Sequence, residues 1–239
     1  MSFQVKLKMA RIIQTVLLIF LVGFARISQA ESPFADCPDL FRVGRSCFEV
    51  IKNPRPGILA EKHRNVMGFV LGRDSFEHAK TLLGDVNVWH SGDASTSEDK
   101  ICYVADSGKQ QAIMVLASNS EMSMGAVDEV RFLKGEVAFK DRCSKVKLPL
   151  KNLQTKSGLF VGMPVKKMKE MLGRPTEEKK ELIVYSFYDM KELTPEDPLY
   201  SQCEVGGKST AVRSSGVTAG VARGFVQWLV IWFGPDYVC

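Results

Sequence analysis

Residues 158–175, GLFVGMPVKKMKEMLGRP, predict one short helix with a defined start and end. Pro164 suits a first helical turn, where its missing N–H costs no hydrogen bond. Gly173 and Pro175 are typical of the residues that end a helix. Between them, apolar residues recur at helical spacing among charged ones: Val165, Met168, Met171 and Leu172. A helix of about eleven residues is not stable alone, so we expect its apolar face to pack on a sheet.

A second stretch earlier in the chain, residues 68–85 (GFVLGRDSFEHAKTLLGD), has the same order of features. Asp74 or Ser75 can cap the start of its helix, and Gly84 can end it. The expected buried stripe consists of Phe76, Ala79, Leu82 and Leu83. The two stretches therefore predict two similar helices.

Three strand-like segments follow each helix. After the first helix they are residues 100–106, 110–118 and 126–135, and after the second they are residues 182–189, 199–205 and 224–234. A helix followed by three strands, found twice, predicts an α+β protein of two tandem units. In each unit the helix would pack on its own antiparallel sheet.

The pattern of the later unit is Gly162, Met163, Val165, Leu172, Gly173 and Pro175, followed by Tyr185 and Tyr188. It resembles the helix and first strand of the SmpA/OmlA family, the BamE-like outer-membrane assembly lipoproteins. It also resembles the β-lactamase inhibitory protein (BLIP) family, whose fold is a tandem of such units. The earlier stretch matches a looser variant through Gly72, Phe76, Leu83 and Gly84. The resemblance implies a BLIP-like tandem fold that works by contacting another protein.

Residues 1–30 have the marks of a secretory signal peptide. Basic residues precede an apolar run of about thirteen residues, and the segment ends with Ser28-Gln29-Ala30. The run is shorter than the roughly twenty residues of a membrane span, although an uncleaved anchor is the alternative. The resembled lipoproteins carry a lipidated cysteine directly after the signal, whereas Cys37 here follows Asp36. We therefore expect a periplasmic or secreted protein without stable membrane insertion.

The net charge gives no reason to expect a nucleic-acid or membrane partner. Residues 1–30 hold four basic side chains and no acidic one, so their removal lowers the formal net charge from +5 to +1. A nearly neutral protein has no electrostatic attraction for polyanions.

All six cysteines lie after the predicted signal, which favours disulfides in an exported chain. We expect Cys37 with Cys47 in the N-terminal arm, Cys102 with Cys143 tying the first and last strands of the first unit, and Cys203 with Cys239 in the second unit. A metal or thiol site is the weaker alternative, because no CxxC occurs and the only histidines are His63, His78 and His90. We predict no metal and no cofactor.

These features divide the chain into four parts. Residues 1–30 are the signal peptide, and residues 31–57 form a proline-rich, irregular arm stapled by a disulfide. Residues 58–147 form the first unit and residues 148–239 the second.

Two stretches imitate catalytic or nucleotide-binding motifs. Residues 206–210, GGKST, look like the end of a phosphate-binding loop, but Gln202 stands where that motif needs glycine. We expect residues 206–220 to form a flexible loop instead.

His90, Asp93 and Cys102 could act as base, orienter and thiol nucleophile if the fold brought them together. Since Cys102 lies in an apolar segment, we expect it to be paired or buried, and we expect no enzyme.

A candidate partner surface comes from comparing residues 126–135 with residues 224–234, aligned at their final glycines. The alignment assigns Val130, Phe132, Leu229 and Ile231 to the face that packs on the helix. The opposite face carries Glu129, Arg131 and Leu133 in one segment and Trp228, Val230 and Trp232 in the other. An uncovered aromatic face would bind a partner, with Tyr188 as a neighbour. The alternative is that the arm, the 206–220 loop or the first unit covers it.

The leading functional hypothesis is therefore an exported, non-catalytic module that binds another envelope or secreted protein. A second hypothesis is a secreted inhibitor that inserts residues 91–99 into the active site of a hydrolase. The third is an envelope enzyme that uses Cys102 or His90.

Overall fold

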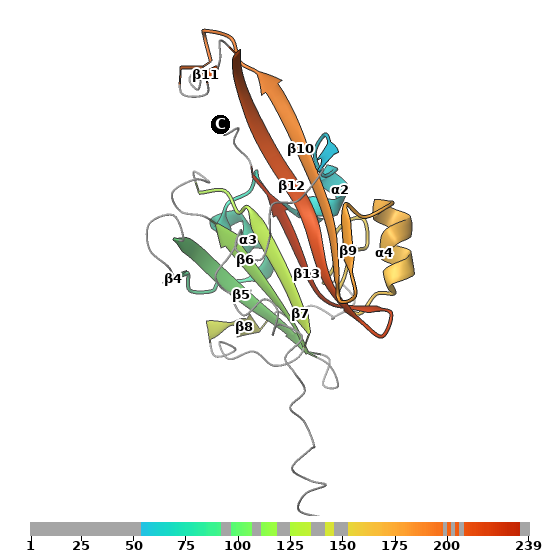
Figure 1. The fold of residues 1–239 in the computed structure, drawn as a ribbon. Helices are drawn as coiled ribbons and strands as arrows, with labels where there is room; N and C mark the ends of the chain where they lie inside the picture. Colours follow the sequence, from blue (N-terminus) through green and yellow to red (C-terminus); the bar gives the residue numbers. More distant parts are fainter. Residues whose placement is uncertain are drawn as a thin grey trace, which may run out of the picture. The chain divides into compact units, whose positions relative to one another are not determined.

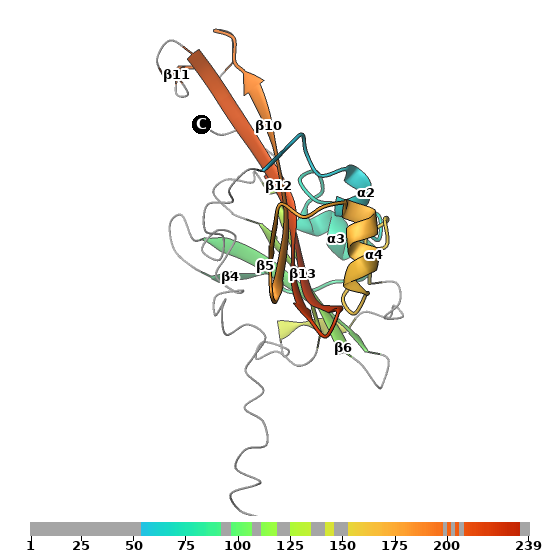
Figure 2. The same ribbon diagram turned by 45° about the vertical axis from the view of Figure 1, so that its right-hand side comes forward.

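The computed structural model describes residues 54–91, 97–106, 111–118, 125–134, 142–145, 153–197, 200–201, 204–205 and 208–234. All of them belong to one compact unit, Arg42–Cys239. Its main element is a large β-sheet with helices on one face (Figures 1 and 2).

In chain order the elements are β1 (Arg55–Pro56), α2 (Glu61–Arg64), β2 (Asn65–Val66), β3 (Phe69–Val70), α3 (Phe76–Leu83), β4 (Trp89–Ser91), β5 (Glu98–Asp106), β6 (Gln111–Ser118), β7 (Glu129–Lys134), β8 (Ser144–Lys145), α4 (Val165–Leu172), β9 (Glu177–Lys179), β10 (Leu182–Glu192), β11 (Glu204–Val205), β12 (Lys208–Ala222) and β13 (Phe225–Phe233).

Within the described ranges the main sheet has eleven strands. Eight of them run side by side in the order β1-β10-β12-β13-β7-β6-β5-β4, and β8, β9 and β11 each pair with one of these. The pairs β1–β10 and β5–β8 are parallel, and the other pairs are antiparallel. Strands β2 and β3 form a separate two-stranded sheet.

The predicted fold of two tandem helix-plus-sheet units is wrong. Strands β7 and β13, the last strands of the two predicted units, pair with each other from Trp228 opposite Leu133 to Trp232 opposite Glu129. The Phe233 N–H extends this pairing by donating to the Asp128 carbonyl over 2.8 Å. The protein is therefore mostly β, with one continuous sheet across the predicted boundary at residues 147 and 148. Pairing satisfies two strand edges that separate units would leave open.

Helix α4 agrees with the sequence pattern, although it is shorter than expected. Its eight residues bury Met168 and Leu172, and it ends at Gly173, whose φ of 77° suits glycine. Pro164 directly precedes the helix instead of lying in its first turn. The Val165 N–H donates to the Gly224 carbonyl over 2.9 Å, so the turn between β12 and β13 supports the helix start.

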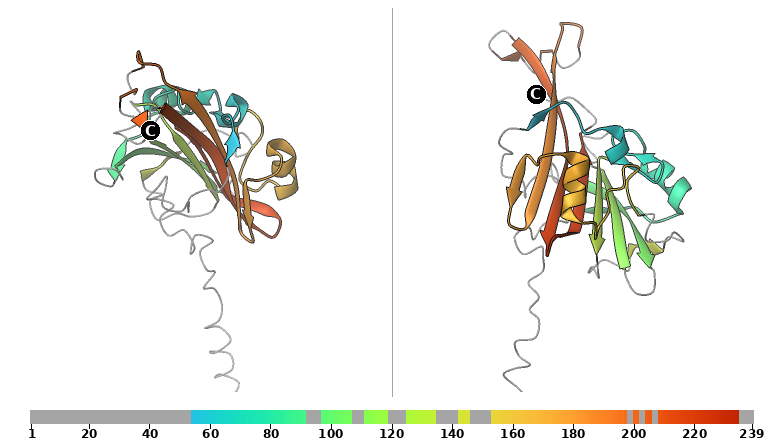
Figure 3. Two further views of the ribbon diagram at one scale, coloured as in Figure 1. Left: turned by 45° about the horizontal axis from the view of Figure 1, so that its top comes forward. Right: turned by 90° about the vertical axis from the view of Figure 1, so that its right-hand side faces the viewer.

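Helix α3 is capped by Ser75, whose hydroxyl accepts a hydrogen bond from the His78 N–H. Ala79 and Leu83 are buried against the sheet, as expected. The sequence predicts Leu82 in the same buried stripe, but its side chain is 44% exposed. The buried face of this eight-residue helix is therefore narrower than the predicted stripe of four apolar residues. Figure 3 shows α3 and α4 beside the sheet in two further views.

The chain approaches the two helices through similar backbone contacts. The Gly72 N–H donates to the Val127 carbonyl, just before β7, and the Gly162 N–H donates to the Val226 carbonyl in β13, each over 2.8 Å. The similarity between the two sequence stretches thus corresponds to two helix entries on one sheet.

The segment predicted as a flexible loop, residues 206–220, lies mostly in β12, which has fifteen residues. Residues 199–205 were predicted as a strand, but the described part of them contains only the two-residue β11.

Small residues in β12 have a packing role that composition alone does not reveal. A Cβ at Gly220 would overlap the indole of Trp228, and a Cβ at Gly216 would overlap that of Trp232.

One apolar cluster lies between the helices and the sheet. It includes the helix-face residues that the sequence comparison selected, Val130, Phe132, Leu229 and Ile231, so this assignment is confirmed. Phe233 belongs to the same cluster, and a Cβ at Gly72 would overlap its ring. The Arg64 guanidinium lies 4.0 Å from the centre of that ring. Residues from both predicted units thus share one core.

We expect Gly72→Ala to lower the free energy of unfolding by about 2–5 kcal/mol, because it combines a positive φ with overlap against Phe233. Gly224→Ala is the matched control: Gly224 has φ of 80° and open space around its Cα, so about 1–2 kcal/mol is expected. Urea unfolding measures both. Equal losses would contradict the packing of Phe233 on Gly72.

Candidate functional site

The predicted partner surface does not form an open patch. Trp228 and Val230 are only 4% and 5% exposed, and Trp232 and Tyr188 are partly buried. The burial agrees with the alternative that this face is covered. The proposed covering loop, residues 206–220, lies mostly in β12 within the same sheet, and the first predicted unit lies edge to edge with β13. The N-terminal arm lies largely outside the described residues.

A network of buried charges lies on the same face of the sheet. Arg131 is 1% exposed and binds Glu129 on its own strand, and its Nη2 atom donates to Glu98 over 2.8 Å. Lys100 is 3% exposed and lies 2.7 Å from another oxygen of Glu98. The network contains two acidic and two basic side chains, and burial raises the pKa of Glu129 although Arg131 opposes that effect. Ala117 lies between Lys100 and Glu129 in the strand register and leaves room for these long side chains.

The surroundings shift the pKa values of the network in opposite directions. Burial lowers the pKa of Lys100, although Glu98 opposes that effect. Burial also acts to lower the pKa of Arg131, but the two carboxylates outweigh it and raise the pKa overall. Arg131 therefore stays charged, and its charge is held in place by Glu129 and Glu98. The network thus links β5 with β7 through ion pairs between largely buried side chains.

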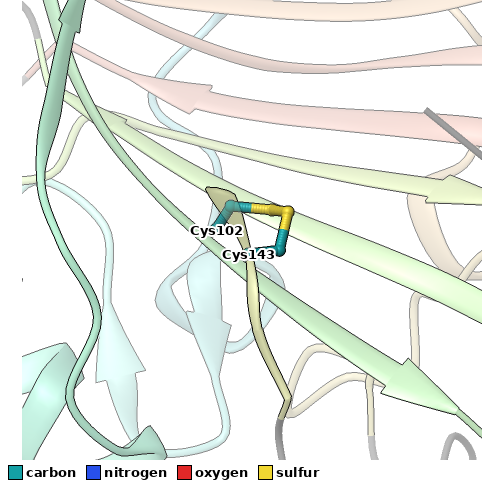
Figure 4. Close-up of a disulfide and its surroundings, with 2 residues drawn as sticks. All are labelled: Cys102 and Cys143. Atoms are coloured by element: carbon teal, nitrogen blue, oxygen red, sulfur yellow. A yellow bond between two sulfur atoms is a disulfide. The ribbon is translucent and has the colours of Figure 1, made fainter. Parts of the chain in front are cut away.

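The predicted disulfide between Cys102 and Cys143 is present, with 4.5 Å between the two Cα atoms (Figure 4). It connects β5 to the residue just before β8, whereas a link to the last predicted strand was expected. Because the Cys102 sulfur is bonded to Cys143, it is not a thiol nucleophile in this structure. The other predicted disulfide cysteines, Cys37, Cys47, Cys203 and Cys239, lie outside the described residues.

The β4–β5 hairpin carries a group of polar side chains that contact one another, of which His90 is the most exposed. Trp89, His90 and Ser91 of β4 lie opposite Lys100, Asp99 and Glu98 of β5. His90 Nδ1 is 2.9 Å from Asp99 Oδ1, and His90 Nε2 is 3.4 Å from Ser97 Oγ. On the other face of the hairpin, Lys100 donates to the Ser91 hydroxyl over 2.7 Å. Side-chain contacts therefore hold the two strands together on both faces.

The sequence hypothesis grouped His90 with Asp93 and Cys102, and the structure groups it differently. Asp93 lies outside the described residues, and Cys102 is in the disulfide. The missed partners, Ser97 and Asp99, become neighbours of His90 only through the strand register. The one available signal was the segment from Trp89 to Lys100, with strand-like ends around a Gly-Asp pair, which is typical of a hairpin.

The part of the chain that the structure describes contains no group of three or more potential metal ligands. Nor does that part contain a helix long and apolar enough to cross a membrane. The phosphate-binding alternative needs a helix after Lys208, and β12 begins there instead.

Comparison with protein-family models found no match for this chain, and comparisons with characterised proteins and with solved structures found no significant similarity. The resemblance to the BamE-like and BLIP-like families consequently stays a prediction from short motifs.

We expect Trp228→Ala to destabilise the protein by about 3–5 kcal/mol, because the buried indole fills the space above Gly220. Phe225→Ala, at the 48% exposed start of the same strand, is the control and should cost roughly 1 kcal/mol or less. Thermal unfolding followed by near-UV circular dichroism compares them. An unchanged melting temperature for Trp228→Ala would mean that the ring is a surface group.

A double-mutant cycle tests the buried network. Arg131→Met leaves the buried carboxylate of Glu129 without its partner and removes one of the two cations that contact Glu98, so we expect a loss of about 3–5 kcal/mol. Adding Glu129→Leu removes the unpaired carboxylate and should recover most of that loss. Urea unfolding of the single and double variants gives the coupling energy. Additive losses would show that Arg131 and Glu129 do not depend on each other.

Proposed function

We propose that this chain is an exported protein-binding module that presents the β4–β5 hairpin to another envelope or secreted protein. The observation that supports it is the clasp on both faces of this hairpin: His90 with Asp99 and Ser97 on one face, and Lys100 with Ser91 on the other.

A hairpin whose strands are joined by side-chain hydrogen bonds is suited to binding, because those side chains are already ordered. Association costs about 0.5–1.5 kcal/mol for each flexible side chain that becomes fixed at an interface. Here the strands are held by their own contacts, and β5 is anchored further by the Cys102–Cys143 disulfide and by the Arg131 network. A partner would therefore meet a preformed surface.

The accessible groups at this hairpin combine apolar and polar chemistry. Val88, just before β4, is 43% exposed, and the His90 side chain is 54% exposed. An apolar contact beside an imidazole is typical of a protein interface, whose core is apolar and whose rim is polar. The buried residues Trp228 and Val230 have no part in this proposal.

Export is proposed from the signal-like residues 1–30 and from the cysteines. A stable disulfide fits an oxidising compartment such as the periplasm or the extracellular medium. Detection of the cleaved chain in a periplasmic or culture fraction would support export, and retention of residues 1–30 in a cytoplasmic chain would contradict it.

Hydrolase inhibition is the second candidate, and the same hairpin favours it. The parts of β4 and β5 that are held by their own side-chain contacts would lose little conformational entropy in such a complex. Residual activity measured across a panel of envelope hydrolases separates the two ideas. Binding without inhibition would leave the binding proposal and remove the inhibitor proposal.

Site-specific photocrosslinking tests where the partner binds. A benzophenone amino acid at Val88 should crosslink one defined protein in the native envelope, whereas the same group at Met190 should not. Met190 is 58% exposed in β10, close to the other end of the strand order. The crosslinked protein is then purified, and its affinity for the chain is measured.

We expect Val88→Asp to weaken that binding at least about tenfold, since it places a charge in an apolar contact. Met190→Asp is the matched control and should leave the affinity unchanged. Equal effects of the two substitutions, or crosslinking only from position 190, would contradict docking through the β4–β5 hairpin.

A further inference from the structure

The contacts of His90 follow a catalytic order. Asp99 Oδ1 lies at Nδ1 of the imidazole, and Ser97 Oγ lies at Nε2. With the proton on Nδ1, His90 donates to Asp99 and its Nε2 accepts from the Ser97 hydroxyl. This order of nucleophile, base and orienting carboxylate is the one that acyl-transfer enzymes use, and it is recognised by geometry and not by position in the sequence.

The two distances differ in a way that suits these roles. The 2.9 Å contact between His90 and Asp99 fixes the ring, while the 3.4 Å contact to Ser97 is longer than an ideal hydrogen bond. In structures without substrate, nucleophile-to-base contacts are often long and shorten when substrate binds. The strand pairing of His90 with Asp99 holds the base and its orienting residue in register.

We propose that Ser97, His90 and Asp99 form a hydrolytic site for small carboxylic esters, an activity separate from the proposed binding role. Ser97 would be the nucleophile and His90 the general base. Asp99 would be a positioning residue that acts through His90. The residues alone predict no catalysis, and this juxtaposition of side chains is the reason to revise that prediction.

The reaction balances without a cofactor. Ser97 Oγ forms a bond to the ester carbonyl carbon while its proton moves to His90 Nε2. Collapse of the tetrahedral intermediate breaks the bond to the alcohol oxygen, and His90 returns the proton to that oxygen. Water then attacks the acyl-serine, again with His90 as base, and releases the carboxylic acid and Ser97.

The exposed fractions of the three side chains limit the size of the ester that can react. The His90 side chain is 54% exposed and that of Asp99 is 35% exposed, but Ser97 is only 6% exposed. A leaving group can therefore lie in solvent beside the imidazole, whereas the acyl group must fit close to the hairpin. Acetyl esters should react faster than butyryl or longer esters.

The test uses the full disulfide-bonded chain with p-nitrophenyl acetate. We expect an initial burst of p-nitrophenol of about one per chain, followed by slower turnover, as an acyl-enzyme predicts. Ser97→Ala should remove the burst and lower kcat/KM at least about 100-fold. Asp99→Asn should lower kcat with KM nearly unchanged, and Asp99→Glu should restore part of the loss.

His78→Gln is the control, because His78 is another exposed histidine beside an aspartate, with its Nδ1 3.4 Å from Asp74. The His78→Gln variant should react at the wild-type rate. That result would show that an exposed histidine does not hydrolyse the ester simply by being at the surface. If Ser97→Ala keeps the burst while His90→Gln removes it, histidine is the nucleophile and the proposal is overturned.

A fluorophosphonate probe on the wild-type chain, with mass spectrometry of the modified peptide, gives an answer even if a variant fails to fold. Modification of Ser97 supports the proposal, and a chain with neither burst nor modified Ser97 overturns it. Photocrosslinking from Val88 would be unaffected by either outcome, so the binding proposal stands or falls separately.

Discussion

The pairing of β7 with β13 is the constraint on which the rest of the structure depends. It places Phe132 beside Leu229 and Val130 beside Ile231, so that apolar residues from both halves of the chain face the same helices. A shift of one residue would turn these side chains to the opposite face of the sheet. The register of this one strand pair therefore decides that both halves of the chain contribute to one apolar cluster beneath the helices.

The same register also determines which side chains are neighbours on the opposite face of the sheet. It places Glu129 beside Trp232 and Arg131 beside Val230, so buried charges and indole rings become neighbours. Small residues on adjoining strands make this possible, since Gly216 and Gly220 accommodate the rings and Ala117 lies between the charged residues of β5 and β7. The charged network and the disulfide then hold β5, and β5 in turn supports the hairpin that we propose as the functional surface.

Local features of the fold could be predicted from the sequence because they depend on nearby residues. The helix at Val165–Leu172, its end at Gly173 and the helix-facing side of β7 and β13 follow from apolar spacing and glycine positions. The merger of the two sheets could not be predicted, because periodicity identifies a strand and its buried face but not the edge with which it pairs. The prediction of a flexible loop at residues 206–220 is wrong for a related reason: glycines in this segment make room for Trp228 and Trp232 within β12. At the candidate site, the residue type alone identifies His90 as a candidate catalytic group. Ser97 and Asp99 lie beside it only because β4 and β5 pair in this register, which the sequence does not reveal.

Native-state hydrogen exchange tests most directly whether the two halves form one cooperative sheet. If they do, the slowest amides of β5 and β6 on one side and of β10 and β12 on the other will exchange with the same free energy of opening, and β7 and β13 will share it. Two distinct free energies, one for the strands up to β7 and another for those from β10 onward, would show that the halves open independently and would contradict a core shared by the two halves.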